Sequence, residues 1–433
     1  MRRKGLMCWL KGLGGIGEFL FFLGVLSLPA LAQISIVREG RPMTKIVLGE
    51  KATDVEKHAA DELQKYVREI SGAKLNLIRE NKIGLSRNRS FIIIGTPASS
   101  RLINSWKEML KISEIKYDGF VIKEMHYRNN RFLVFASSEP RGTLYAVYDF
   151  LENELGVGFF WQEDRIPHRK NISVREQLER QSSPYFKYRE YLQGCALTYS
   201  WMKYWDFEKW KKEIDWAAKH KFNMLWYPGG GSIVVKRVYK RLGVDLGKPT
   251  QEEIEKSRLA RQIINYARSI GMKVVGGGFS GRVKEVLKKV YPGAKYMGIR
   301  WLNLPPRLYL DPSDPLFEKI GQYFIEEYTK EYGTDHFYDV GAYGEVNPGA
   351  SREEKTKLQV NFARAVSSYI RKADPKGIWH MSGWTFQNSR FWTPESIRLF
   401  LAAIPDDMYL VNDVYADTRP KYKELNYFWG KNW

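Results

Sequence analysis

The sequence contains very little cysteine, with only Cys8 and Cys195 in 433 residues. Cys8 lies in an N-terminal segment that we expect to be removed, so no disulfide within the remaining chain is predicted. The chain also lacks a dinucleotide-binding fingerprint, because the glycines at 276–278 do not have the G-x-G-x-x-G spacing. These absences argue against a disulfide-stapled fold and against a doubly wound nucleotide-binding sheet.

The first 32 residues have the pattern of a secretory signal peptide. Basic residues occupy positions 2–4, an apolar stretch runs from Phe19 to Leu31, and small residues at 30–32 form a cleavage site. The apolar stretch is shorter than the roughly 20 residues that a membrane-spanning helix needs. We therefore expect cleavage before Gln33, a secreted or periplasmic location, and no stable membrane insertion afterwards.

The formal net charge is +20, yet the basic residues are dispersed and mixed with acidic ones, as in 207–221 and 252–268. This mixture is typical of solvated helix faces. Together with the expected export, it argues against a nucleic-acid partner, and an acidic polysaccharide remains an alternative. Aromatic residues make up 14% of the chain, and such rings serve either as hydrophobic core or as stacking platforms for sugars.

Residues 33–180 are predicted to form a small α/β supporting domain with a mostly antiparallel sheet. Apolar positions repeat with helical spacing in 55–70 and 143–155, and glycines follow both segments. Short β-rich runs separate these helices. The predicted strands lie at 45–48, 91–94, 117–123 and 131–136.

Residues 181–433 alternate between strands and helices, which is typical of βα units with a parallel sheet. The predicted strands lie at 188–193, 223–227, 273–279, 335–343, 377–381, 408–411 and 427–433. The predicted helices lie at 206–220, 254–270, 315–332, 356–372 and 394–404. About seven strands indicate a TIM (β/α)8-type barrel that is incomplete at its C-terminal end.

In such barrels the active site lies at the C-terminal ends of the strands. Acidic residues at these positions are Glu190 in the first strand, Glu345 after the fourth, and Asp413 and Asp417 after the sixth, while the direction of Asp339 is left open. Glycoside hydrolysis usually needs two carboxyl groups, one of which protonates the departing oxygen. Glu345, in "DVGAYGEVNPG", is the best acid/base candidate, and a surface-loop glutamate is the alternative.

Several ordered blocks from about residue 188 to the end resemble glycoside hydrolase family 89, the α-N-acetylglucosaminidases. They include "CALTYSWMKYWDFEKWKKEIDWAAKHKFN", "YGTDHFYDVGAYGEVNP", "FWTPESIRLFLAAIP" and "NDVYADTRPKY". The resemblance implies a retaining hydrolase that releases terminal α-linked N-acetylglucosamine from an oligosaccharide or glycoconjugate, without a metal or an organic cofactor. The earlier stretch "KATDVEKHAADELQKYVREISGAKL" resembles the N-terminal domain of α-glucuronidases, which implies a supporting role.

The resemblance also assigns site residues. Glu345 matches the family's acid/base, and Gln193, Cys195, Trp301 and Trp384 match positions at the sugar site. Tyr343 and Asp413 are further predicted substrate-binding residues. Gln193 stands where the family has a sugar-contacting asparagine, and Asp413 could orient the sugar or tune Glu345. The alternatives are a small buried hydrophobe for Cys195, core packing for Trp384 and a loop-capping aspartate for Asp413.

Three departures from the family pattern shape the functional hypotheses. Gly344 replaces a sugar-contacting asparagine, an aromatic loop is missing from 243–257, and the family's nucleophile is expected after the segment that begins "FWGKNW". An exported glycosidase is the leading interpretation. One alternative is an α-glucuronide or other hexosaminide substrate, read by Arg282 and Arg307. The other is a carbohydrate-binding barrel without catalysis.

Overall fold

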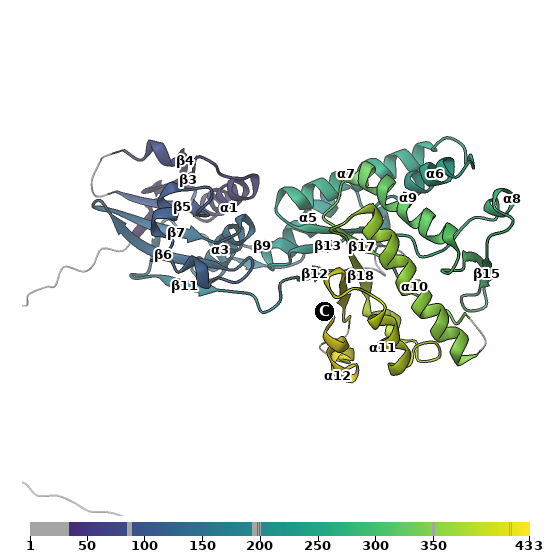
Figure 1. Cartoon of the computed structure of the whole chain (residues 1–433). Coiled ribbons are helices and arrows are strands. Elements are labelled where there is room, and N and C mark those ends of the chain that lie inside the picture. The colour runs from purple at the N-terminus through teal and green to yellow at the C-terminus, as the bar shows by residue number, and fades with distance from the viewer. Residues whose placement is uncertain are drawn as a thin grey trace, which may run out of the picture.

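The computed structural model describes residues 34–84, 89–192, 197, 199, 201–348, 351–414, 416 and 418–433. Figure 1 shows two lobes: an N-terminal lobe drawn in purple to blue, and a C-terminal lobe drawn in teal to yellow. No helix in these described ranges is long and apolar enough to cross a membrane.

The N-terminal lobe is built on a six-stranded sheet in which parallel pairs outnumber antiparallel ones. The order is β11 (Glu179–Ser182), β6 (Phe120–Tyr127), β7 (Asn130–Ala136), β5 (Ser90–Gly95), β3 (Thr44–Leu48) and β4 (Asn76–Arg79). The pairs β7–β5, β5–β3 and β3–β4 are parallel. The prediction of a mostly antiparallel sheet is therefore wrong. Helical crossovers connect strands of this sheet, and a crossover is the connection that parallel strands require.

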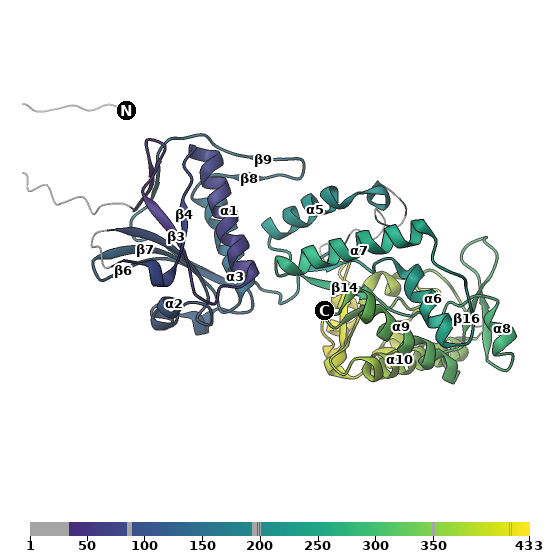
Figure 2. The same ribbon diagram turned by 90° about the horizontal axis from the view of Figure 1, so that it is seen from above.

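Helix α1 (Asp54–Ser71) supplies the first of these crossovers, between β3 and β4. Thr53 and Glu56 form a capping box at its start, and Gly72 adopts a left-handed conformation (φ 81°) at its end. Figure 2 shows α1 and α3 (Pro140–Asn153) on one side of the sheet and α2 (Arg101–Trp106) on the other. Short strands complete the lobe. They are β1 (Ile34–Arg38), β2 (Arg41–Pro42), β8 (Gly158–Phe159), β9 (Asp164–Arg165) and β10 (Ile172–Val174).

The C-terminal lobe contains a curled, fully parallel sheet of six strands, as in an incomplete TIM-type barrel. The order is β12 (Glu190–Tyr191), β13 (Met224–Trp226), β14 (Lys273–Gly277), β17 (Phe337–Asp339), β18 (Ile378–Ser382) and β19 (Tyr409–Asn412). Residues 427–433 were predicted to open a seventh strand. There the structure has a 3₁₀ turn, Asn426–Gly430, and a single parallel bridge between Leu410 and Asn432.

Helices cover the outside of this sheet (Figure 1). They are α5 (Phe207–Lys219), α6 (Gly231–Arg241), α7 (Gln251–Ser269), α9 (Pro315–Tyr332), α10 (Arg352–Ala373) and α11 (Pro394–Ala402). The predicted bounds of α9 are those observed, because Asp314 caps it, Pro315 opens it and Gly333 follows it. Three minor elements also matter below: α12 (Lys421–Glu424), and the hairpin of β15 (Tyr296–Ile299) and β16 (Arg307–Leu310).

A buried carboxylate, Asp118, joins the two lobes. Its Oδ2 atom accepts hydrogen bonds from Arg141 of the N-terminal lobe (2.8 Å) and from Arg189 (2.7 Å) and Asn223 (2.8 Å) of the barrel. Burial raises the pKa of Asp118, but the Arg189 and Arg141 guanidiniums more than offset this and lower the pKa below its ordinary value. Tyr145 adds a hydrogen bond to the backbone oxygen of Phe222 (2.8 Å). The supporting lobe thus contacts the start of the first two barrel strands.

Candidate active site

Glu345 lies in the loop that follows β17, and its side chain is exposed. Two residues earlier, Tyr343 has a left-handed backbone (φ 47°), a conformation that non-glycine residues seldom adopt and that is found repeatedly at functional sites. The Tyr343 ring is only 7% exposed and packs against Phe362 and Phe391. The prediction that Tyr343 contacts sugar does not fit this placement, because the ring fills the hydrophobic core below the loop.

Two tryptophans hold the Glu345 carboxylate. The indole Nε1–H of Trp301 donates to Oε2, and that of Trp384 donates to Oε1, each at 2.8 Å. Both carboxylate oxygens therefore have a neutral donor, and the group is oriented without a neighbouring cation in either bond. The structure brings these three predicted residues together, although they are separated by 39 and 44 positions in the chain.

Different elements position the two indoles. Trp301 belongs to the loop between β15 and β16, where the next residue, Leu302, also has a left-handed backbone (φ 53°). Trp384 lies in the 3₁₀ turn Gly383–Gln387 that follows β18, with Ser382 as its cap. A Cβ atom on Gly383 would lie 2.7 Å from the backbone oxygen of Asn412, so only glycine permits this close approach to β19. The turn is thereby held beside the neighbouring strand end.

The Glu345 carboxyl group lies beside an indole that is open to solvent. Trp384 is 42% exposed, and Leu302, which follows Trp301 in the chain, is also exposed. Flat aromatic faces and aliphatic groups suit the C–H faces of a sugar ring, while the carboxyl group can exchange a proton with a ligand. Gly344 has room for a side chain, since a Cβ there would lie 3.5 Å from Thr385 and 3.8 Å from the Trp384 ring.

Of the remaining predicted site residues, the structure describes Asp413. Asp413 accepts a hydrogen bond from the backbone N–H of Tyr422 in the first turn of α12 (2.9 Å). This contact fits the alternative interpretation of Asp413 as a loop-capping aspartate. Burial raises the pKa of Asp413 above its ordinary value. Gln193 and Cys195 lie outside the described residues, as does Asp417.

A buried polar layer inside the barrel was not predicted from sequence. The imidazole of His380, on β18, contacts Glu190 Oε2 through Nε2 (2.8 Å) and Asp339 Oδ1 through Nδ1 (3.0 Å). Asn412 on β19 donates to the same oxygen of Glu190 (2.6 Å). Burial lowers the pKa of His380, but Glu190 and Asp339 together raise it to about 10. The imidazole is therefore a cation between two carboxylates at neutral pH.

No set of three His, Cys, Asp or Glu side chains in the described residues is placed to hold a metal ion. The buried layer contains one histidine and two carboxylates, but these are bonded to one another.

Comparison with known proteins assigns the chain to a family. The family model described as the alpha-N-acetylglucosaminidase (NAGLU) TIM-barrel domain matches residues 189–254 and 246–433. The chain belongs to this family. A second model, the glycosyl hydrolase family 67 N-terminus, matches residues 37–150, so both resemblances drawn from the sequence are confirmed.

Individual relatives agree with the family match. Human alpha-N-acetylglucosaminidase is 29% identical over 278 residues, which cover 57% of this chain and 37% of the human protein. The family 89 glycoside hydrolase of Clostridium perfringens, solved with 2-acetamido-1,2-dideoxynojirmycin, superposes with a TM-score of 0.61 at 15% identity. That match covers 86% of this chain and 41% of the bacterial one. It supports the fold, an N-terminal domain followed by an incomplete barrel of this type.

Proposed function

We propose that this chain is part of an exported, retaining exo-α-N-acetylglucosaminidase in which Glu345 is the acid/base. The observation that carries the proposal is the pair of 2.8 Å hydrogen bonds by which Trp301 and Trp384 orient the exposed Glu345 carboxyl group. Family membership supports the reaction class, and the position of Glu345 after a barrel strand supports the role.

In this mechanism the protonated Glu345 gives its proton to the glycosidic oxygen as the bond from that oxygen to the anomeric carbon breaks. A second carboxylate attacks the anomeric carbon and forms a glycosyl–enzyme intermediate. Glu345 then takes a proton from water, and the water oxygen replaces the second carboxylate. The proposal assigns that second carboxylate to a part of the protein outside this sequence, since the family resemblance places the nucleophile after residue 433.

A solved complex of the Clostridium perfringens enzyme contains GlcNAc-α-1,4-galactose as its substrate. For the present chain we propose the same class of ligand, a glycan ending in an α-linked N-acetylglucosamine. The open, aromatic surroundings of Glu345 support a terminal sugar bound with one face against Trp384.

An azide-rescue assay tests the role of Glu345 without relying on the second carboxylate. Azide supplies an external nucleophile: a bond forms between its nitrogen and the anomeric carbon, the bond from that carbon to the glycosidic oxygen breaks, and the departing alcohol takes the Glu345 proton. We expect azide to accelerate release of alcohol from aryl α-N-acetylglucosaminides and to yield the β-glycosyl azide. Glu345→Gln should lower this rate by about 10²–10⁴ for a poor leaving group and much less for dinitrophenolate, which needs no proton.

The matched control is Glu353→Gln, a change at an exposed carboxylate in the first turn of α10. It should leave both rates unchanged. If Glu345→Gln affects good and poor leaving groups equally, Glu345 is not the acid. If the chain binds the sugar but azide produces no turnover, the non-catalytic carbohydrate-binding barrel becomes the better interpretation.

Export is proposed from the signal-like pattern in residues 1–32, which lie outside the described residues. N-terminal sequencing of the protein recovered from the periplasm or the medium should begin at Gln33. Recovery only in the cytoplasm, with Met1 retained, would contradict this proposal.

A further inference from the structure

The inner face of the barrel sheet carries two layers of side chains with different chemistry. The lower layer is apolar, and strands β13, β14, β17, β18 and β19 contribute Met224, Val275, Phe337, Ile378 and Leu410 to it. Side chains two residues apart in a strand lie on the same face of a sheet. The next inward positions on β17, β18 and β19 are Asp339, His380 and Asn412. With Glu190 of β12, these residues form the polar layer described above, which lies nearer the C-terminal ends of the strands.

The polar layer leads directly into the candidate active site. Asp339 is the last residue of β17, and the loop that follows it carries Glu345 six residues later. His380 is on β18, and Trp384 lies in the turn that follows this strand. Strands β17 and β18 are parallel, so both loops leave from the same end of the barrel. The polar layer therefore faces the end of the barrel at which Glu345 and Trp384 meet.

This layer has more hydrogen-bond acceptors than donors. His380 donates to Oδ1 of Asp339 and to Oε2 of Glu190, and Asn412 donates to the same Glu190 oxygen. Within the described residues, Glu190 Oε1 is buried without a partner, and Asp339 Oδ2 accepts no hydrogen bond. Buried polar groups in proteins are nearly always hydrogen bonded. Two carboxylate oxygens of the layer therefore lack a donor.

Asp339 is the carboxylate of this layer that a ligand can reach. Its side chain is 22% exposed, compared with 7% for Glu190. The 3.0 Å contact with His380 holds Oδ1, so Oδ2 is fixed in position and can accept a hydrogen bond. An ionised carboxylate accepts hydrogen bonds but cannot donate them. The ligand group that fits is therefore a donor, and the donors of a neutral sugar ring are its hydroxyl groups.

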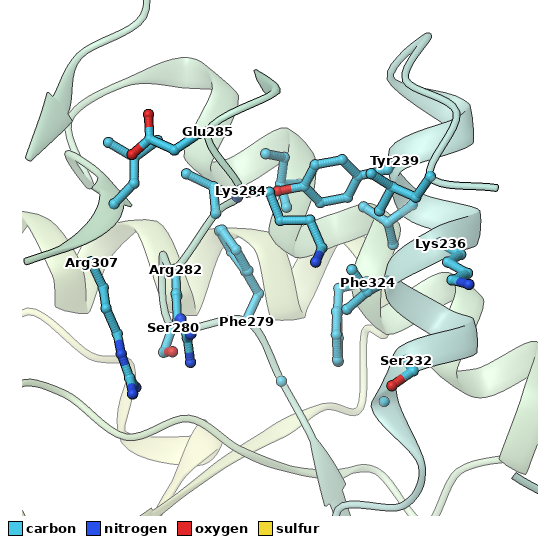
Figure 3. A pocket seen from close by; sticks show the side chains of 18 of the residues that line it. Ser232, Lys236, Tyr239, Phe279, Ser280, Arg282, Lys284, Glu285, Arg307 and Phe324 are labelled. Carbon is cyan, nitrogen blue, oxygen red and sulfur yellow. Dashed lines mark hydrogen bonds between the residues drawn. The ribbon is translucent and has the colours of Figure 1, made fainter. Parts of the chain in front are cut away.

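The basic cavity beside the barrel mouth is separate from this layer. Figure 3 shows Lys236, Arg282, Lys284 and Arg307 among the side chains that line the cavity. Its walls are the segment after β14, helix α6 and the start of β16, and no residue of the polar layer lines it. The cations of this cavity therefore do not supply the donors that the two carboxylate oxygens lack.

We propose that Asp339 binds a hydroxyl group of the terminal sugar and is a specificity-determining residue of the active site. Oδ2 accepts the hydroxyl hydrogen, while the contact of Oδ1 with His380 keeps the carboxylate in place. The sequence left the direction of Asp339 open, and the structure turns it toward the interior of the barrel. The inference rests on the proposed function, since it concerns the sugar whose glycosidic oxygen Glu345 protonates. It adds a charged contact to the aromatic contacts around Glu345.

Deoxy sugars test for such a contact in the unmodified chain. Affinities for methyl α-N-acetylglucosaminide and for its 3-deoxy, 4-deoxy and 6-deoxy analogues are measured by calorimetry. Hydrogen bonds to charged groups are stronger than neutral ones, so the analogue that lacks the bound hydroxyl should bind about 10- to 100-fold more weakly than the parent sugar. If all three analogues bind as tightly as the parent, the inference is overturned and the proposed function stands.

Two variants then assign the sensitive hydroxyl to Asp339. Asp339→Asn removes the charge and keeps an oxygen for His380, and it should bind the parent sugar about 10- to 100-fold more weakly than the wild type does. It should bind the parent and the sensitive analogue equally, because the two changes remove the same contact. Asp339→Glu keeps the charge beside His380 but displaces the free oxygen, so it should show the same loss of discrimination with the ion pair retained.

The matched control is Asp407→Asn, at a 70% exposed aspartate just before β19 and so at the opposite end of the barrel. It should keep the wild-type pattern of affinities. If the Asp339 variants bind the parent and every analogue more weakly by one common factor, Asp339 has a structural role and the inference is overturned. A loss for one analogue that persists in both variants also overturns it. If the wild-type chain does not bind methyl α-N-acetylglucosaminide, the proposed function and this inference both fail.

Discussion

Glu345 and Glu190 are glutamates of the same barrel in opposite surroundings. The Glu190 side chain is 7% exposed and contacts His380, whose imidazole is 1% exposed and also contacts Asp339. Glu345 is exposed and, within the described residues, accepts hydrogen bonds from the neutral N–H groups of two tryptophans. A carboxylate fixed beside a buried cation contributes to the fold, whereas one oriented by neutral donors in reach of solvent can gain and lose a proton. The group that each glutamate contacts, more than the residue type, distinguishes the structural role of Glu190 from the proposed catalytic role of Glu345.

The largest expected effect is on the stability that His380 and its two carboxylate partners contribute. His380→Leu leaves Glu190 and Asp339 facing each other without the imidazole cation, and removing one member of a buried ionic group costs about 3–5 kcal/mol of the free energy of unfolding. Urea denaturation at pH 7 measures this loss. The control is His126→Leu, whose side chain is 70% exposed beside Glu124, and which should change stability by about 0.5 kcal/mol or less. Similar losses in both variants would remove the distinction between buried and exposed pairs.

The pH dependence of stability sharpens the same comparison. The folded-state pKa of His380 is raised from 6.5 to about 10, so the stabilisation that it supplies is complete below about pH 6.5 and declines as pH approaches 10. The folded-state pKa of Asp118 is lowered from its ordinary value of 3.8. The stabilisation that this carboxylate supplies is therefore complete above about pH 3.8 and is lost as pH falls through the folded-state pKa. The difference in urea midpoint between wild type and His380→Leu should shrink from pH 7 to pH 10. A difference in urea midpoint that stays constant from pH 7 to pH 10 would contradict the raised pKa of His380.

At the mouth of the barrel, Trp384→Phe keeps an aromatic ring and removes the N–H that orients Glu345. One hydrogen bond to an exposed charged group contributes about 1 kcal/mol, so kcat/KM in the azide assay should fall about fivefold. The melting temperature should change little by comparison. Trp216→Phe is the control, because the indole N–H of Trp216 has no partner in the described residues. A loss of stability in proportion to activity would indicate a packing role for Trp384.

The smallest expected effect is a gain in affinity for N-acetylglucosamine. Gly344→Asn restores the amide that the family resemblance places beside the acid/base, and the structure has space for its Cβ. One added neutral hydrogen bond of about 1 kcal/mol should tighten N-acetylglucosamine binding about fivefold, as measured by calorimetry. Gly341→Asn, where a Cβ would meet nothing within 4 Å, is the control and should not alter affinity. Weaker binding in Gly344→Asn would place the sugar elsewhere.

Local signals explain what could be predicted of the fold. Helix α9 has an aspartate cap, an opening proline and a closing glycine, and its bounds were predicted correctly. Helix α6 was missed because it begins within a glycine run, has no capping side chain and contains Ile233, Val234 and Val235 in succession. Strand partners in the N-terminal lobe depend on which crossover each helix makes, and periodicity alone does not contain that information.

The candidate site also contains residues that could be predicted from the sequence and residues that could not. Glu345, Trp301 and Trp384 were selected by resemblance to a family, and the structure shows that they meet. Tyr343 was also predicted to bind sugar, but its ring is 7% exposed and packs against Phe362 and Phe391. The charged layer around His380 joins residues from four strands, and no local pattern links them before the sheet curls. Long-range polar contacts of this kind were beyond the sequence analysis.

The hydrogen bond between Asn412 and Glu190 joins positions 222 residues apart, and it connects the two outer strands of the barrel sheet. During synthesis on the ribosome, Glu190 emerges long before Asn412, whereas the N-terminal lobe contains all of its own strands and can fold first. Until β18 and β19 follow, Glu190 has neither its imidazole partner nor its amide partner, and the barrel strands expose apolar surface. The nascent barrel is therefore the stage at which we expect this protein to be most prone to aggregation, and contacts of such long sequence separation also predict slow folding.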